Sequence, residues 1–356
     1  MGQEPGKARA QAGRYVALDG LRGIAALAVA LLHLEPALSP GGYLAVDFFF
    51  ALSGFVLMRG YGARFRSGMT TLAFMKARIV RLYPLFAVGI VVGLLFALQG
   101  LIRQSDNHLS LAAITAALAL NLLMLPAFGS ALYPLNYPAW SLLMELLANI
   151  ALAAVLWRLG RVALLAVAVV SAGLLAWLGQ AAGSLDGGGE WVQFPIALTR
   201  TAWAFSIGTV LATRASSQVR PVSIGALAGF AFLAAVVLFP ATGIRSIYDL
   251  AAALVALPAL VWFGSRLEPP HWCVGPAAFL GEVSYAVYAI NMPVAHVFQY
   301  LGRHLGEPLI VLAPVYIATV LGLARGLVTF IDIPVRRMLR RWVECAPCQT
   351  LREGAA

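Results

Sequence analysis

The first long apolar stretch of the chain carries two ionisable side chains that could act together. It reads LDGLRGIAALAVALLHL, with Arg22 and His33 eleven residues apart. Eleven residues are close to three helical turns, so both side chains leave one helix face about 16 Å apart along the axis. A cation and a titratable imidazole in this arrangement suit a long anionic ligand whose reactive end lies away from its charged end. The alternatives are that Arg22 reaches the lipid headgroups and that His33 hydrogen-bonds a neighbouring helix.

A carboxylate follows in the next apolar run, GGYLAVDFFFALSGFVL, at Asp47. An ionisable side chain in a membrane-spanning helix costs several kcal/mol unless it is paired or hydrated, so each one is a candidate functional residue. Beside an imidazole, a carboxylate can fix the tautomer and stabilise the protonated ring. The alternative reading places Asp47 at a helix end near the outer water interface.

Two further segments carry charge in apolar surroundings. RIVRLYPL contains Arg78 and Arg81, one helical turn apart, and PAWSLLMEL contains Glu145. The two arginines could grip phosphate oxygens or simply satisfy the preference for basic residues on the cytoplasmic side. Glu145 lies well inside an apolar segment and therefore needs a partner.

The elements that must position these residues are membrane-spanning helices. The chain has 356 residues, of which 61% are hydrophobic and 11% are charged, whereas soluble domains carry about 25% charged residues. At about 20 residues per span, the sequence predicts an all-α, polytopic bundle of about ten transmembrane helices. These fall near 16–37, 43–60, 82–101, 138–157, 162–180, 196–213, 222–239, 248–264, 276–298 and 309–331.

The distribution of basic residues predicts the orientation of this bundle. With both termini in the cytoplasm, nineteen Lys and Arg residues lie in inner segments and only Arg103, Arg245 and Arg303 lie in outer loops. This asymmetry agrees with the positive-inside rule and explains the net charge of +10 without nucleic acid. It holds only if the apolar stretch 109–126 does not span, so we expect a re-entrant or interfacial element there. We expect three regions: a cytoplasmic tail over 1–14, a transmembrane domain over 15–335, and a basic cytoplasmic tail over 336–356.

Cysteine and metal chemistry are not expected. The three cysteines are Cys273, Cys345 and Cys348, an odd number that gives no disulfide framework. The last two form a C-x-x-C pair without a second pair of ligands, so we predict no metal.

Five fragments in order resemble the membrane-bound acyltransferase-3 family, bacterial enzymes that O-acylate sugars and related hydroxyl compounds. They are LDGLRGIAALAVALLH, VDFFFALSGFVL, RIVRLYPL, PAWSLLMEL and LGEVSYAVYAIN, within residues 15–340. The resemblance implies a multi-pass protein of the bacterial inner membrane. It also implies an acyl-CoA donor, with acetyl-CoA expected, and a carbohydrate or glycolipid acceptor. Gly and Ala are plentiful in most spans, so a homodimer is compatible with the sequence.

The resemblance also assigns roles to residues. Arg22 and His33 fill the first-span motif, and Asp47 is the second-span acid. Arg78 and Arg81 form the basic pair, and Glu145 completes the Trp-Ser-Leu-acid element. We expect His33 to act as general base, with Asp47 or Glu145 orienting its ring. The three arginines would bind the donor phosphates. In relatives a His often stands where this chain has Asn291, which makes that position a departure.

The alternative from another class is a transporter or flippase for a glycoconjugate or an acyl group, which would also line a central cavity with acid, Arg and His. Many transporters have related halves with paired broken helices. We find no such symmetry in the sequence, which favours the acyltransferase. Acyl-CoA turnover by the purified protein would separate the two.

Overall fold

The protein is an all-helical bundle. The computed structural model describes residues 14–104, 108–215, 220–239 and 242–349, with side chains as far as Arg341. Within these ranges it has no β-sheet, only two isolated bridges. The helices are α2 (Val16–Leu34), α3 (Ala45–Arg66), α4 (Thr71–Ile102), α5 (Leu111–Leu122), α6 (Trp140–Ala154), α7 (Arg161–Ala182), α8 (Phe194–Arg214), α9 (Gly225–Leu238), α10 (Arg245–Ala251), α11 (Leu257–Gly264), α12 (His271–Leu305), α13 (Leu309–Leu327) and α14 (Ile333–Gln349).

The predicted polytopic membrane architecture is confirmed. Within the described residues, eight helical segments are long and apolar enough to cross a membrane. Helices α8 and α9 occupy the other two predicted spans; α8 has 21 residues but a more polar composition, and α9 has only 14. Helix α5 has 12 residues, about 18 Å of helix against a hydrocarbon core of about 30 Å. It is too short to span alone, as expected for the 109–126 stretch.

Close packing of small residues brings the central helices together. A Cβ atom added at Gly23 of α2 would overlap Leu280 of α12, and one added at Gly54 of α3 would overlap the backbone carbonyl of Phe205 in α8. Lipid supplies no hydrophobic force between helices, so such close backbone approach is how membrane helices gain packing energy. Helix α2 makes its most extensive contacts with α12, so the two helices form one wall of the interior.

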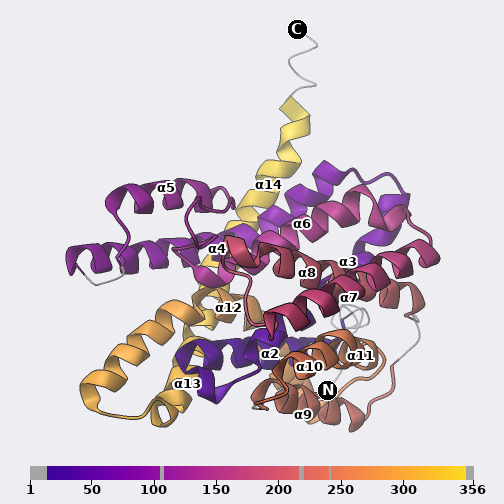
Figure 1. The fold of residues 1–356 in the computed structure, drawn as a ribbon. Coiled ribbons are helices and arrows are strands. Elements are labelled where there is room, and N and C mark those ends of the chain that lie inside the picture. Colours follow the sequence, from indigo (N-terminus) through magenta and orange to yellow (C-terminus); the bar gives the residue numbers. More distant parts are fainter. Residues whose placement is uncertain (1–13, 105–107, 216–219, 240–241, 350–356) are drawn as a thin grey trace, which may run out of the picture.

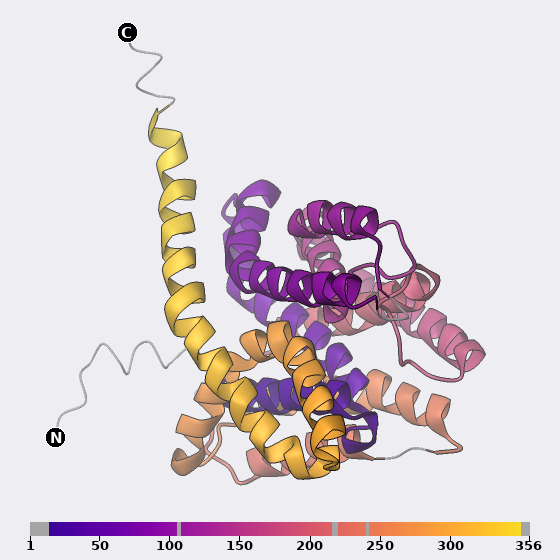
Figure 2. The same cartoon turned by 90° about the vertical axis from the view of Figure 1, so that its left-hand side faces the viewer.

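The helices that carry the predicted site residues lie at different depths in the bundle. Helices α2, α3, α6 and α12 are more than half buried by protein, whereas α7 and the α13–α14 segment are largely exposed. Helices α4 and α5 lie side by side (Figure 1). Helix α14 continues from α13 through a π-helical turn, Val328–Asp332, and extends away from the bundle (Figure 2). The predicted boundary at residue 336 therefore falls inside a helix.

Candidate active site

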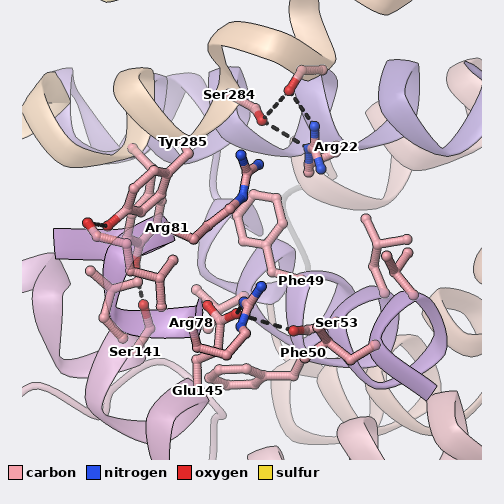
Figure 3. A pocket seen from close by; sticks show the side chains of 18 of the residues that line it. Arg22, Phe49, Phe50, Ser53, Arg78, Arg81, Ser141, Glu145, Ser284 and Tyr285 are labelled. Atoms are coloured by element: carbon pink, nitrogen blue, oxygen red, sulfur yellow. Dashed lines mark hydrogen bonds and ion pairs between the residues drawn. The ribbon is translucent and has the colours of Figure 1, made fainter. Parts of the chain in front are cut away.

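Two adjoining cavities lie between α2, α3, α4, α6 and α12, and we call them together the basic cavity. Their volumes are about 210 and 340 Å³, and they share Arg22, Arg81 and Tyr285 among their lining residues. Figure 3 shows arginine side chains from α2 and α4 converging on the first of them. The structure thus brings together all three arginines predicted to bind an anion, since Arg78 lines the first cavity as well.

Glu145 finds its partner in Arg78. The Arg78 guanidinium lies 2.6 Å from Glu145 Oε1, and the Ser53 hydroxyl donates to the same oxygen at 3.1 Å. This pair joins α4 to α6, and α3 joins it through Ser53. Because Glu145 already neutralises Arg78, neither group offers an uncompensated charge to a ligand.

Arg22 is held by α12. Its Nε donates to Ser284 Oγ at 2.9 Å, and its Nη2 donates to the carbonyl of Gly281 and lies 3.1 Å from Asp19. Asp19 also pairs with Arg14 at 2.5 Å. The guanidinium is therefore fixed in orientation at the junction of the two cavities, with its charge shared with Asp19.

Arg81 differs from the other two arginines. It is exposed to the cavity and makes no ion pair or hydrogen bond with any other residue that the structure describes. The nearby acid Asp332 is already paired with Arg336 at 2.5 Å. In Figure 3 its side chain extends toward Arg22 and Ser284. Arg81 is consequently the guanidinium that an anionic ligand can engage without breaking an existing pair.

His33 is held by Asn291 rather than by a carboxylate. Its Nδ1 lies 2.5 Å from Asn291 Oδ1. The amide nitrogen of Asn291 donates to the carbonyls of Val287 at 3.1 Å and Tyr288 at 2.8 Å. Carbonyl oxygens only accept, so the nitrogen must face them and the amide oxygen must face the imidazole. Nδ1 of His33 then carries the proton, which leaves Nε2 of the neutral ring with a free lone pair.

The expectation that Asp47 or Glu145 orients the imidazole is wrong. Asp47 is 1% exposed and pairs with Arg200 of α8, which is fully buried, at 2.6 Å. Arg200 also donates to the backbone carbonyls of Tyr43, Leu185 and Gly187. The Asp47 carboxylate is thus occupied in neutralising a cation that joins α3 and α8 to the loop after α7.

Arg200 and the α12 residues Gly281, Ser284 and Tyr288, which line the basic cavity, were not predicted from the sequence. The signal for Arg200 was present, because an arginine inside an apolar segment requires an acid and Asp47 was available. On α12, Gly281, Ser284, Tyr288 and Asn291 recur every three or four residues. That spacing marks one helix face, the face that contacts Arg22 and His33.

A third cavity of about 540 Å³ lies at the opposite ends of α4 and α12, and we call it the distal cavity. Along α12, residues from Gly281 to Tyr288 line the basic cavity and residues from Met292 to Arg303 line the distal one. Asn291, which holds His33, stands between the two sets. His33 is not among the described residues that line either cavity. It lies at the level of Asn291, between the part of α12 that lines the basic cavity and the part that lines the distal cavity.

Comparison with known proteins adds a family. Residues 15–327 match the family model described as an acyltransferase domain. The chain is also similar to a Rhizobium radiobacter protein described as protein 2 in the picA locus. The two are 40% identical over 155 residues, which are 38% of this chain and 79% of that protein. No solved structure matches the chain.

The buried Asp47–Arg200 pair predicts a stability defect. Replacing Asp47 with Asn leaves the Arg200 guanidinium buried without a counter-charge, which should cost about 3–5 kcal/mol. The melting midpoint in detergent, followed by fluorescence-detected size exclusion, measures this loss. Asp186→Asn is the matched control, because Asp186 is exposed and pairs with Arg245 at 3.8 Å, and exposed pairs contribute about 1 kcal/mol or less. Equal midpoints for the two variants would contradict the structural role of Asp47.

Proposed function

The chain belongs to the acyltransferase-3 family, and from this membership we propose that it transfers an acyl group, expected to be acetyl, from acyl-CoA to a hydroxyl of a carbohydrate or glycolipid acceptor. The observation that carries the proposal is the common position of Arg22 and His33 against α12, with an anion-accepting cavity at the level of Arg22. A charged end and a reactive end of one donor would then be held by one pair of helices.

The basic cavity is proposed to hold the phosphates of acyl-CoA. Arg81 supplies an uncommitted guanidinium, and the fork of such a group matches phosphate oxygens. Arg22 and Arg78 line the same walls in fixed orientations, with their charges compensated by Asp19 and Glu145. An extended pantetheine arm would run along α2 and bring the thioester toward His33, about 16 Å further along the helix axis.

His33 is proposed to act as general base. The acceptor hydroxyl oxygen attacks the thioester carbonyl carbon, and the hydroxyl proton moves to Nε2. Collapse of the tetrahedral intermediate breaks the carbon–sulfur bond, and the leaving CoA sulfur takes the proton back from the imidazolium. The products are an ester and free CoA thiol. Throughout, the Nδ1 proton stays on the hydrogen bond to Asn291, which keeps Nε2 directed at the reacting groups.

The end of the bundle at the basic cavity is proposed to face the cytoplasm of a bacterial cell. Several arginines gather at this end of the bundle. They are Arg14 before α2, Arg64 and Arg66 at the end of α3, and Arg336 at the beginning of α14. The positive-inside rule assigns such a concentration of basic residues to the cytoplasmic side, where acyl-CoA would be available. The distal cavity would then open toward the outer face.

The direct test of the proposed function is His33→Ala in purified, reconstituted protein supplied with acetyl-CoA. Loss of the general base should lower the rate of acyl transfer at least about 100-fold. Release of free CoA thiol and acylated product are measured together, because a transporter would consume no acyl-CoA. His271→Ala is the matched control, since His271 is exposed at the beginning of α12 and is not among the described residues that line the basic or the distal cavity. Undiminished transfer by the His33→Ala protein would remove His33 from the base role.

Arg81→Gln tests the donor site. Losing one charge-assisted hydrogen bond to phosphate should raise the KM for acetyl-CoA by about 10- to 100-fold. The acetyl thioester of N-acetylcysteamine has no phosphate, so its KM should be the same for the variant and the parent protein. Arg214→Gln, at an exposed helix end outside both cavities, controls for loss of a surface charge. An equal increase of KM for both thioesters would exclude phosphate binding by Arg81.

Asn291→Asp tests how the imidazole is positioned. A carboxylate beside Nδ1 stabilises the protonated ring, so the neutral base form appears only at higher pH. The acidic limb of the pH–rate profile should therefore shift to higher pH. A residue that served only packing would lower the rate at every pH and leave that limb in place. The measurement is kcat/KM for acetyl-CoA from pH 5 to pH 9. An unmoved limb would show that Asn291 does not govern His33.

A further inference from the structure

The distal cavity has the wall composition of a binding site for a polar ring. Phe96 of α4 and His296 of α12 meet edge to face there, with ring centroids 5.9 Å apart. Tyr137 and Tyr300 add further aromatic surface, and Asn136 adds an amide. Sites that bind small molecules combine such aromatic surface with a few polar groups that fix orientation. At about 540 Å³ the cavity also has the volume of a small-molecule site.

Among the described residues that line this cavity, the formally charged side chains have one sign. Arg103, which follows α4, and Arg303 of α12 both line it and are exposed. None of the described residues that line it is Asp or Glu, and residues 105–107 lie outside that description. Neither arginine makes an ion pair with another described residue. In contrast, Arg245, the third arginine of the predicted outer loops, pairs with Asp186 and packs on the ring of Tyr43.

The cavity is also placed to present its occupant to His33. Met292 and Pro293 line it and directly follow Asn291, which holds the imidazole. On the opposite side of Asn291, Tyr288 lines the basic cavity. An occupant of the distal cavity and a donor in the basic cavity would therefore approach His33 from opposite directions along α12.

We propose that the distal cavity binds the acceptor, and that this acceptor is an anionic carbohydrate unit carrying a phosphate or carboxylate group near the hydroxyl that is acylated. This rests on the proposed function and names its substrate class. The guanidinium groups of Arg103 and Arg303 bind the anion, because their planar forks match both phosphate and carboxylate. The aromatic side chains pack against the sugar ring. The hydroxyl then faces Nε2 of His33.

The test compares ligands that share the ring hydroxyl pattern of glucose and differ in the group at carbon 6, which is neutral in one and anionic in two. The full chain is reconstituted in nanodiscs of phosphatidylcholine, and the Kd values of glucose 6-phosphate, glucuronate and glucose are measured by thermal shift. Both anionic sugars should bind at least about tenfold more tightly than glucose, the effect of about 1.4 kcal/mol. Equal Kd values for charged and neutral sugars, or no binding of any of the three, would overturn the proposal.

Variants locate the preference in the cavity. In Arg103→Gln and Arg303→Gln the ratio of neutral to anionic Kd should fall toward one, and Arg303→Lys should keep part of it. Arg214→Gln, at the opposite end of the bundle, is the matched control and should keep the full ratio. A ratio that both glutamine variants leave unchanged would show that the anion binds elsewhere, and the proposal would fail.

Two further measurements separate this proposal from the proposed function. Hydrolysis of acetyl-CoA in the same nanodiscs without any sugar, with water in place of the acceptor hydroxyl, reports the donor reaction alone, so hydrolysis combined with equal sugar binding would refute only the anionic acceptor. Replacing part of the phosphatidylcholine with phosphatidylglycerol distinguishes the source of the anion. Acylated phosphatidylglycerol in mass spectra would identify a lipid headgroup, and acylated glucose 6-phosphate would identify a soluble or polymeric sugar. Only the second product supports the proposal, because phosphatidylglycerol has an anionic headgroup but no sugar ring, and its acylation alone would overturn the carbohydrate assignment.

Discussion

A polar side chain inside a membrane must find its hydrogen-bonding and charge partners within the protein, because lipid offers none. Most of the interior of this bundle follows from that constraint. Arg200 is fully buried with Asp47, Arg78 is held by Glu145, and Arg22 rests on α12 and on Asp19. The Asp47–Arg200 and Arg78–Glu145 pairs join helices that are distant in the sequence, and the hydrogen bonds of Arg22 to Gly281 and Ser284 join α2 to α12. The interactions that satisfy these charges therefore also hold helices together.

The groups that these pairs leave uncommitted are the ones suited to chemistry. Arg81 faces the basic cavity without an ion-pair partner among the described residues, and Nε2 of His33 keeps its lone pair because Asn291 engages only Nδ1. An amide in this position differs from a carboxylate in one respect. It fixes the tautomer without adding a charge that would favour the protonated ring. Nε2 of the imidazole is therefore left without a hydrogen-bonding partner among the described residues.

The arrangement along α12 separates two environments with one helix. Its first half lines the basic cavity with its paired and unpaired charges, and its second half lines the distal cavity with its aromatic side chains and exposed arginines. Helix α4 repeats this division, with Arg78 and Arg81 in one cavity and Phe96 and Gln99 in the other. A reaction between two polar substrates that reach the membrane from opposite sides requires this kind of division, with the reacting groups at the boundary.

The sequence by itself determined the all-helical membrane architecture, the positions of most of its long apolar helices, the family, and the shared face of Arg22 and His33. These properties are local: they depend on runs of apolar residues, on the helical period and on the order of short motifs. Only the tertiary structure decided the pairing of Asp47 with Arg200, 153 residues away, and of His33 with Asn291, 258 residues away. The helical period states which side chains share a face, but not which helix that face meets. The partner of a buried charge is therefore known only when the neighbouring helices are known.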